Sequence, residues 1–232
     1  MTGNIAMLMS VAKGLQHLRE NVVFVGGCVT ELYAFNPEMS DIRATQDVDC
    51  IIEISSYIRL GDLEEELRKL KFCHDTSKGA PICRWIYGDI KVDIMPTHSD
   101  IMGFSNRWYP DGMKNKIETE LPDCTNIYIL SPEYYLATKF EAHRDRGGDD
   151  LRTSHDFEDI IYIIDNNDDV CEIVRECANI ELKQYLVEQC TLLINNENIL
   201  ESIDCMLPVG SQEDRVHYIY GLMKDISSMG IY

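Results

Sequence analysis

The segment Val22–Gly27, with the sequence VVFVGG, decides how the first half of the chain folds. Its four apolar residues predict a compact buried strand, and the spacing over residues 28–35 predicts a helix directly after the glycines. Glycines at such a junction let backbone N–H groups approach a phosphate closely, and the helix N-terminus adds a favourable dipole. We therefore expect Gly26 and Gly27 to bind phosphate, with a simple tight turn as the alternative. The sequence has neither the P-loop spacing nor the dinucleotide-binding fingerprint.

Two aspartates stand at the start of the next predicted strand, Val48–Ile54. Asp47 and Asp49 are two residues apart, so the alternation of a strand places both carboxylates on one side while Val48 faces the core. Acids within an apolar run are costly without a partner. This cost favours a functional role for the pair over the alternative of two carboxylates that simply face water.

A third acid lies in the hairpin predicted over residues 82–95, where Gly88 and Asp89 form the turn signal. Asp93 follows the turn in an alternating run that can pair beside the strand of the first two acids. Crowded carboxylates repel one another unless a cation is present, and Mg²⁺ favours oxygen-only sites. The sequence therefore predicts a divalent-metal site formed by Asp47, Asp49 and Asp93, for Mg²⁺ with Mn²⁺ as an alternative. Taken alone, Asp93 is equally well explained as a surface residue of a strand edge.

The pattern changes after residue 130. Ser131-Pro132-Glu133 is typical of a helix start, and helical periodicity continues from there to the C-terminus. We therefore expect an α+β fold with a first domain over residues 1–130, a mixed sheet with flanking helices, and a helical bundle over residues 131–232. The predicted helices of the second part cover residues 134–146, 154–164, 170–177, 182–194 and 213–228.

Composition limits the classes of function. The 232 residues include 40 acidic and 21 basic ones, a formal net charge of -19. Such a chain repels phosphate backbones, which argues against a broad nucleic-acid footprint but leaves room for a local basic groove or a cationic acceptor. The nine cysteines form no C-x-x-C pair, which predicts reduced thiols in a cytoplasmic protein. No apolar run is long enough to span a membrane, so we expect no membrane partner.

Three motifs in this order resemble the nucleotidyltransferase superfamily: Val25-Gly26-Gly27, Arg43–Asp49 (RATQDVD) and Val92–Pro96 (VDIMP). The likeness is greatest to the bacterial AbiEii/MenT-type toxins of toxin–antitoxin systems, and it covers residues 22 to 164. The resemblance implies a nucleotidyltransferase-like fold, two bound Mg²⁺ ions, an NTP substrate such as ATP, and an antitoxin partner. It assigns the glycine N–H groups to the β- and γ-phosphates.

The resemblance continues in the helical half. Lys139, in the stretch YLATKFEA, matches the family's lysine that contacts the nucleotide phosphates, and Asp156, in SHDFEDI, matches the acid that orients it. Many relatives carry Lys or Arg just before that acid, where this chain has His155. Arg43 and Thr45 are candidates for contacts with phosphate or base, with a loop salt bridge or a strand cap as the equally good alternative.

The implied reaction is the transfer of a nucleoside monophosphate to a hydroxyl group, with Asp93 also a candidate general base. Three acceptors stay open: a tRNA 3′ end, which the resemblance favours, and a protein side chain or a cationic small molecule, which the negative charge favours. Arg84 and Lys91 on the hairpin are candidates for lining the acceptor groove, or else solvated strand-edge residues. Two other readings remain: a catalytically silent nucleotide sensor or interaction module on the same fold, and a structural α+β protein.

Overall fold

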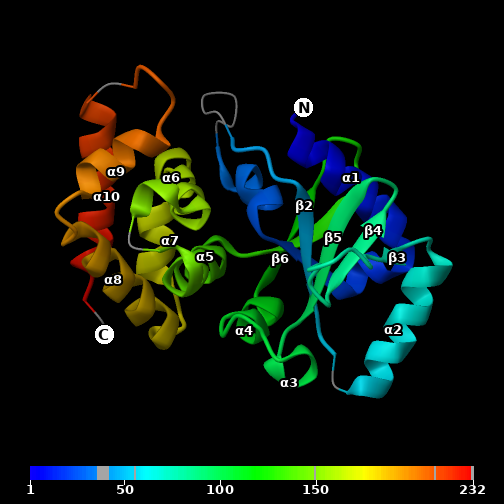
Figure 1. Cartoon of the computed structure of the whole chain (residues 1–232). Coiled ribbons are helices and arrows are strands. Elements are labelled where there is room, and N and C mark those ends of the chain that lie inside the picture. The colour runs from blue at the N-terminus through cyan, green and yellow to red at the C-terminus, as the bar shows by residue number, and fades with distance from the viewer. Residues whose placement is uncertain (36–41, 55, 149, 212, 231–232) are drawn as a thin grey trace. The chain divides into compact units, whose positions relative to one another are not determined.

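A computed structural model describes residues 1–35, 42–54, 56–148, 150–211 and 213–230 of the chain (Figure 1). The chain divides into two compact units. The first comprises Met1–Val29 and Arg43–Ser131, and the second comprises Thr30–Ile42 and Pro132–Tyr232. The second unit therefore includes a segment from the first fifth of the sequence as well as everything after Ser131.

The described part of the first unit contains a mixed sheet of seven strands in the order β3-β4-β5-β2-β1-β7-β6. Strand β2 pairs antiparallel with β1 and parallel with β5, and β1 pairs parallel with β7. The remaining neighbours are antiparallel. The strands are β1 (Val22–Val25), β2 (Asp47–Ile52), β3 (Cys73–His74), β4 (Arg84–Tyr87), β5 (Ile90–Pro96), β6 (Lys116–Glu120) and β7 (Asn126–Leu130).

Helices flank this sheet, which confirms the predicted α+β class. All four residues of β1 are buried, as expected for a central strand covered on both faces. Helix α1 contacts β2 and β5 and buries an apolar face that includes Leu8 and Leu15. The helices of this unit are α1 (Gly3–Leu15), the 3₁₀ helix η1 (Gln16–Asn21), α2 (Tyr57–Lys69), α3 (Ser99–Met102) and α4 (Tyr109–Lys114).

The predicted hairpin is confirmed. Tyr87 pairs with Ile90, so the turn between β4 and β5 consists of Gly88 and Asp89 alone. Gly88 has φ +60°, and Asp89 is not among the residues with positive φ. A two-residue turn with glycine in the first position and positive φ only there is of type II′. The order Gly-Asp therefore suits this turn as Asp-Gly suits type I′.

One predicted helix is different in the structure. The residues after Gly26 form a 3₁₀ helix, η2 (Gly27–Tyr33), instead of an α-helix. Its sequence, GCVTELY, contains several residues of low helical propensity. A 3₁₀ helix is tighter, has poorer hydrogen-bond geometry and is rarely long. The dipole argument for phosphate binding is therefore lost here, and only the backbone of the glycines supports it.

The regular elements among the described residues of the second unit are helices, as predicted. Helix α9 is an addition to the predicted set. Helix α5 begins at Pro132, and the chain leaves it through Gly148, which has φ +70° and so forms the expected helix stop. The core between the helices contains Phe157, Ile160 and Leu186. The helices are α5 (Pro132–Arg146), the 3₁₀ helix η4 (Leu151–Thr153), α6 (His155–Asn166), α7 (Val170–Glu176), α8 (Ile180–Ile194), α9 (Ile199–Met206) and α10 (Glu213–Ser227).

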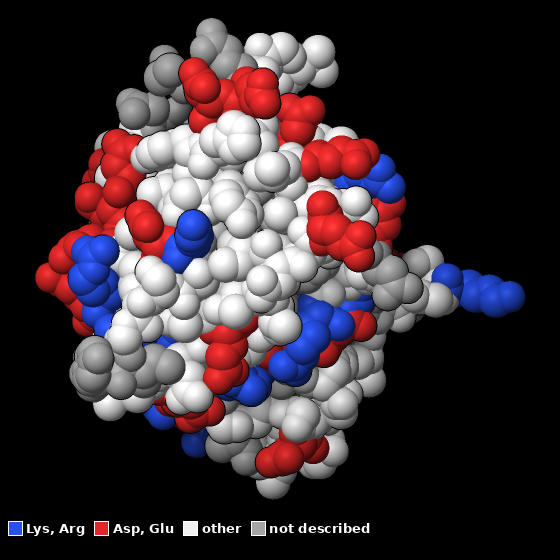
Figure 2. Space-filling model, turned by 90° about the vertical axis from the view of Figure 1, so that its left-hand side faces the viewer, with Lys and Arg blue, Asp and Glu red and all other residues white. Residues whose placement is uncertain are grey.

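The negative charge is concentrated in the second unit. Its sequence holds 24 of the 40 acidic residues and only 8 of the 21 basic ones, whereas the first unit holds 16 acidic and 13 basic residues. Figure 2 shows basic side chains in small groups among acidic ones, around an area that carries neither. Among the described residues, no helix combines the length and the apolar character needed to cross a bilayer.

Candidate functional site

The structure brings the three predicted metal-site acids together at neighbouring strands of the first unit. Strand β2 carries Asp47 and Asp49, with buried Val48 between them. In the parallel pairing of β2 with β5, Asp49 is opposite Asp93. The prediction that Asp93 lies beside the first two acids is therefore confirmed. We call these three residues the acid cluster.

Arg84 of β4 lies against the acid cluster. Its Nε donates to Oδ1 of Asp93 at 2.8 Å and its Nη2 to Oδ2 of Asp93 at 2.6 Å, a bidentate pair. Nη2 also donates to Oδ2 of Asp47 at 3.1 Å. The hydrogen bond with Asp93 is the largest of the effects that raise the pKa of Arg84 above its usual value. Arg84 is therefore not a solvated strand-edge residue, because it neutralises part of the acid cluster. Its predicted place in an acceptor groove stays a prediction.

Gly26 is required by the acid cluster for a reason that the sequence did not reveal. Its φ of +73° is a left-handed conformation that other residues rarely adopt. In addition, a Cβ atom at this position would come within 1.9 Å of Oδ2 of Asp49. Val25, just before it, pairs with Asp49 across the β1–β2 ladder. The turn after β1 thus leaves the space that the Asp49 carboxylate occupies.

Asn4 of α1 positions the segment that leads into β2. Its side-chain amide donates to the carbonyl oxygen of Arg43 at 2.9 Å, and its Oδ1 accepts from the backbone N–H of Thr45 at 3.0 Å. The Thr45 hydroxyl donates to the carbonyl oxygen of Asp47 at 3.2 Å. Thr45 thereby caps the strand, and its predicted contact with phosphate or base stays a prediction. Asn4 is 2% exposed, and its backbone carbonyl oxygen also accepts a hydrogen bond from Sγ of Cys28.

The chemistry of the acid cluster suits a hard divalent cation, but its present arrangement holds a guanidinium. Three aspartates supply only oxygen donors, the kind that Mg²⁺ and Mn²⁺ take. Among the described residues, no three His, Cys, Asp or Glu side chains are placed to hold a metal ion as they stand. Both carboxylate oxygens of Asp93 and one of Asp47 are committed to Arg84. The donor set therefore fits a metal that takes the place of Arg84.

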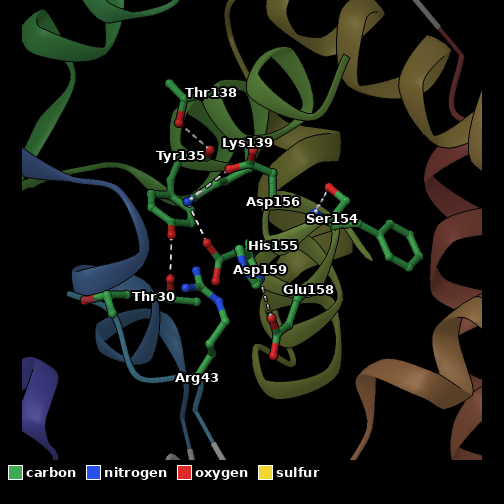
Figure 3. A network of polar contacts seen from close by, with 12 residues as sticks. Thr30, Arg43, Tyr135, Thr138, Lys139, Ser154, His155, Asp156, Glu158 and Asp159 are labelled. Carbon is green, nitrogen blue, oxygen red and sulfur yellow. Dashed lines mark hydrogen bonds and ion pairs between the residues drawn. The ribbon is translucent and has the colours of Figure 1, made fainter. Parts of the chain in front are cut away.

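In the second unit, Lys139 of α5 points towards two carboxylates of α6 (Figure 3). Its Nζ donates to Oδ2 of Asp159 at 2.6 Å and lies 3.5 Å from Oδ1 of Asp156. Lys139 and Asp159 are both buried, so each charge needs the other. Asp159, one helical turn after Asp156, is the closer partner and was not expected from the sequence. The predicted contact of Lys139 with phosphate stays a prediction.

Asp156 also pairs with a second positively charged side chain, that of Arg146. Nε and Nη2 of Arg146 donate to its two carboxylate oxygens at 2.8 and 3.0 Å. Burial alone would raise the pKa of Asp156, but the Arg146 hydrogen bonds and the Lys139 charge outweigh it and leave the pKa below its usual value. His155 is exposed, and its Nδ1 lies 3.5 Å from a carboxylate oxygen of Glu158. We call Lys139, Asp156 and Asp159 the lysine cluster.

A cavity of about 620 Å³ lies elsewhere in the first unit. Its lining includes Ile52 and Thr97, at the carboxyl ends of β2 and β5, together with Met113, Lys114 and Lys116. Of the described residues that line the cavity, none belongs to the acid cluster. The cavity and the acid cluster are therefore separate features.

All nine cysteines are free thiols. Burial raises the pKa of Cys50, next to Asp49, well above its usual value, and it raises the pKa of Cys83 to about 11. Thiols with such pKa values are protonated at neutral pH and are poor nucleophiles. The two cysteines near the acid cluster are therefore packing residues.

Comparison with models of known protein families gives no match to this chain. Comparison with curated protein sequences gives no match either.

Proposed function

We propose that this chain is a metal-dependent nucleotidyltransferase that transfers a nucleoside monophosphate from an NTP to a hydroxyl acceptor. One observation carries the proposal: Asp49 and Asp93 are opposite each other on parallel strands, with Asp47 two residues away and a Gly-Gly turn beside them. The proposal includes a nucleotidyltransferase-like fold for the first unit. The motif resemblance supports it independently of the geometry.

The chemistry follows from the residues of the first unit. The acid cluster would hold Mg²⁺, which when bound neutralises the triphosphate and lowers the pKa of the acceptor hydroxyl. Backbone N–H groups of Gly26 and Gly27 donate to the β- and γ-phosphates. Asp93 accepts the hydroxyl proton, the acceptor oxygen forms a bond with the α-phosphorus, and the bond to the β-phosphate oxygen breaks. Pyrophosphate leaves with the electron pair of that bond. In such phosphoryl transfers, positioning of the reactants and stabilisation of the developing charge account for most of the catalysis.

The first test is the variant Asp49→Asn, which keeps the shape of the side chain and removes its charge. We expect transfer from labelled NTP in the presence of Mg²⁺ to fall by at least about 10²–10³-fold, the loss typical of removing one charge-stabilising group. Asp62→Asn is the matched control, because Asp62 is an exposed residue of α2 in the same unit. Equal transfer by both variants, with equal unfolding midpoints, contradicts the proposal.

A catalytically silent nucleotide sensor is the second candidate, and Arg84 is the observation that favours it. The guanidinium of Arg84 itself compensates part of the negative charge of the acid cluster. Incubation with Mg²⁺ and each labelled NTP separates the two candidates, since pyrophosphate release indicates an enzyme and binding alone indicates a sensor. Adding total RNA or a cell lysate then identifies the acceptor, because the label enters RNA, protein or small molecules.

A further inference from the structure

We propose that Arg84 is a positioning residue that closes the acid cluster to divalent cations until a triphosphate arrives, and then pairs with that triphosphate. The inference rests on the proposed nucleotidyltransferase function. It goes further, because it assigns an order to metal and nucleotide binding and gives Arg84 two alternating partners.

Arg84 and a metal ion compete for Asp93. Both carboxylate oxygens of Asp93 accept hydrogen bonds from the guanidinium, at 2.8 and 2.6 Å. Asp93 is 7% exposed, so water has little access to these oxygens. Each oxygen keeps a second lone pair, but a cation there would lie against the positive charge of the guanidinium, so metal binding at Asp93 and the Arg84 pair oppose each other.

The closed state of the acid cluster, with Arg84 bound, does not open by loss of a proton. Arginine keeps its charge at every pH that a folded protein meets, and a planar guanidinium matches a carboxylate with two parallel hydrogen bonds. Removing one partner of such a partly buried pair leaves an uncompensated charge, which is costly. Arg84 therefore leaves the aspartates readily only when another anion receives it.

A triphosphate is an anion that can receive Arg84. Phosphate oxygens accept the same forked hydrogen bonds as a carboxylate. A nucleotide that brings its own divalent cation satisfies both sides at once, since the cation goes to the aspartates and the phosphates go to the guanidinium. Metal and nucleotide then bind with positive coupling, which by linkage is the same in both directions.

The test measures two affinities in the purified 232-residue chain. The first is the affinity for Mn²⁺ without nucleotide, followed by the electron paramagnetic resonance of the free ion. The second is the affinity for a non-hydrolysable NTP analogue in saturating Mn²⁺. We expect Arg84→Gln to bind Mn²⁺ about 10-fold more tightly and the analogue about 10-fold more weakly than the unchanged protein, within the usual range of coupling between two sites.

Tighter binding of Mn²⁺ together with weaker binding of the analogue is decisive, because a variant that merely folds poorly weakens both affinities. Lys91→Gln is the matched control, since Lys91 is opposite Asp47 on the neighbouring strand and its loss removes the same unit charge. Its effect on Mn²⁺ should be several-fold smaller. If Arg84→Gln does not fold, Arg84→Lys replaces it, because lysine keeps the charge without the fork and should shift both affinities in the same directions by less.

Failure of the role proposed for Arg84 and failure of the proposed function give different results. If Asp49→Asn weakens Mn²⁺ binding but Arg84→Gln leaves either affinity unchanged, the role of Arg84 is overturned while the proposed function stands. If no Mn²⁺ binding depends on Asp49, the proposed function itself fails.

Discussion

Replacing Gly26 with alanine tests whether the turn after β1 and the acid cluster depend on each other. A Cβ atom at Gly26 would lie 1.9 Å from Oδ2 and 2.7 Å from Cγ of Asp49. Ordinary van der Waals contact begins near 3.4 Å, so the methyl group and the carboxylate oxygen must separate by about 1.5 Å, the difference between 3.4 and 1.9 Å. The carboxylate has to rotate away from its place beside Asp93, or the turn has to move.

Two separate losses follow from this geometry. The φ of +73° costs an alanine about 1–2 kcal/mol in the free energy of unfolding, because its Cβ clashes with the following carbonyl oxygen. Moving a metal-binding carboxylate by more than about 1 Å costs on the order of 10²-fold in rate for the proposed reaction. We therefore expect Gly26→Ala to fold with modestly reduced stability and to have almost no transferase activity.

Gly79→Ala is the matched control. Gly79 has a φ of +88°, and a Cβ atom there meets nothing within 4 Å, so this variant has the backbone cost without the displacement. Urea unfolding should show a similar loss for both variants, with an extra loss for Gly26→Ala, and the labelled NTP assay should show a defect for Gly26→Ala alone. Equal stability and equal activity of the two variants would refute the reasoning.

Three further predictions concern buried ionisable groups. Lys139→Met leaves Asp159 buried without its ammonium partner and should lower the free energy of unfolding by about 3–5 kcal/mol in urea titrations, part of which Asp159→Asn restores. Burial lowers the pKa of His143 below its usual value of 6.5, so the unfolded chain takes up a proton at a higher pH than the folded chain does. The free energy of unfolding therefore falls as the pH drops below about 6.5, and His143→Asn should flatten this part of a pH series of thermal melts. Burial raises the pKa of Cys190 to about 12, so a maleimide at pH 7.5 should leave it unmodified in mass spectra after the exposed thiols have reacted, namely Cys73, Cys124 and Cys205.

The parts of the fold that could be predicted are those whose signals are local. Strand β1 was predicted with its observed bounds because four apolar residues and a glycine stop are visible within six positions. The β4–β5 hairpin followed from its turn chemistry. Strand β6 was missed because its residues are mostly exposed and polar, and an edge strand is defined by its pairing partner instead of by its own apolar pattern.

The contact between Arg84 and Asp93 was within reach of the sequence. A two-residue turn at Gly88 and Asp89 fixes the register of the hairpin, and counting outward three pairs from Tyr87 and Ile90 reaches these two residues. Residues directly opposite on an antiparallel pair interact. The role of Asn4 was not within reach, because it depends on packing α1 against a segment about 40 positions later in the chain.

For the proposed transfer, the charge of each unit bears on the choice of acceptor more than the net charge of the whole chain does. The first unit holds 16 acidic residues, of which three form the acid cluster, leaving 13 against 13 basic residues. With the acid cluster compensated by a cation, the first unit is therefore close to neutral and does not repel a polyanion. The excess of negative charge belongs to the second unit, with 24 acidic and 8 basic residues. A short anionic acceptor confined to the first unit is thus tolerated, whereas an RNA that extends over the second unit meets repulsion, and a basic protein or cationic small molecule meets attraction there.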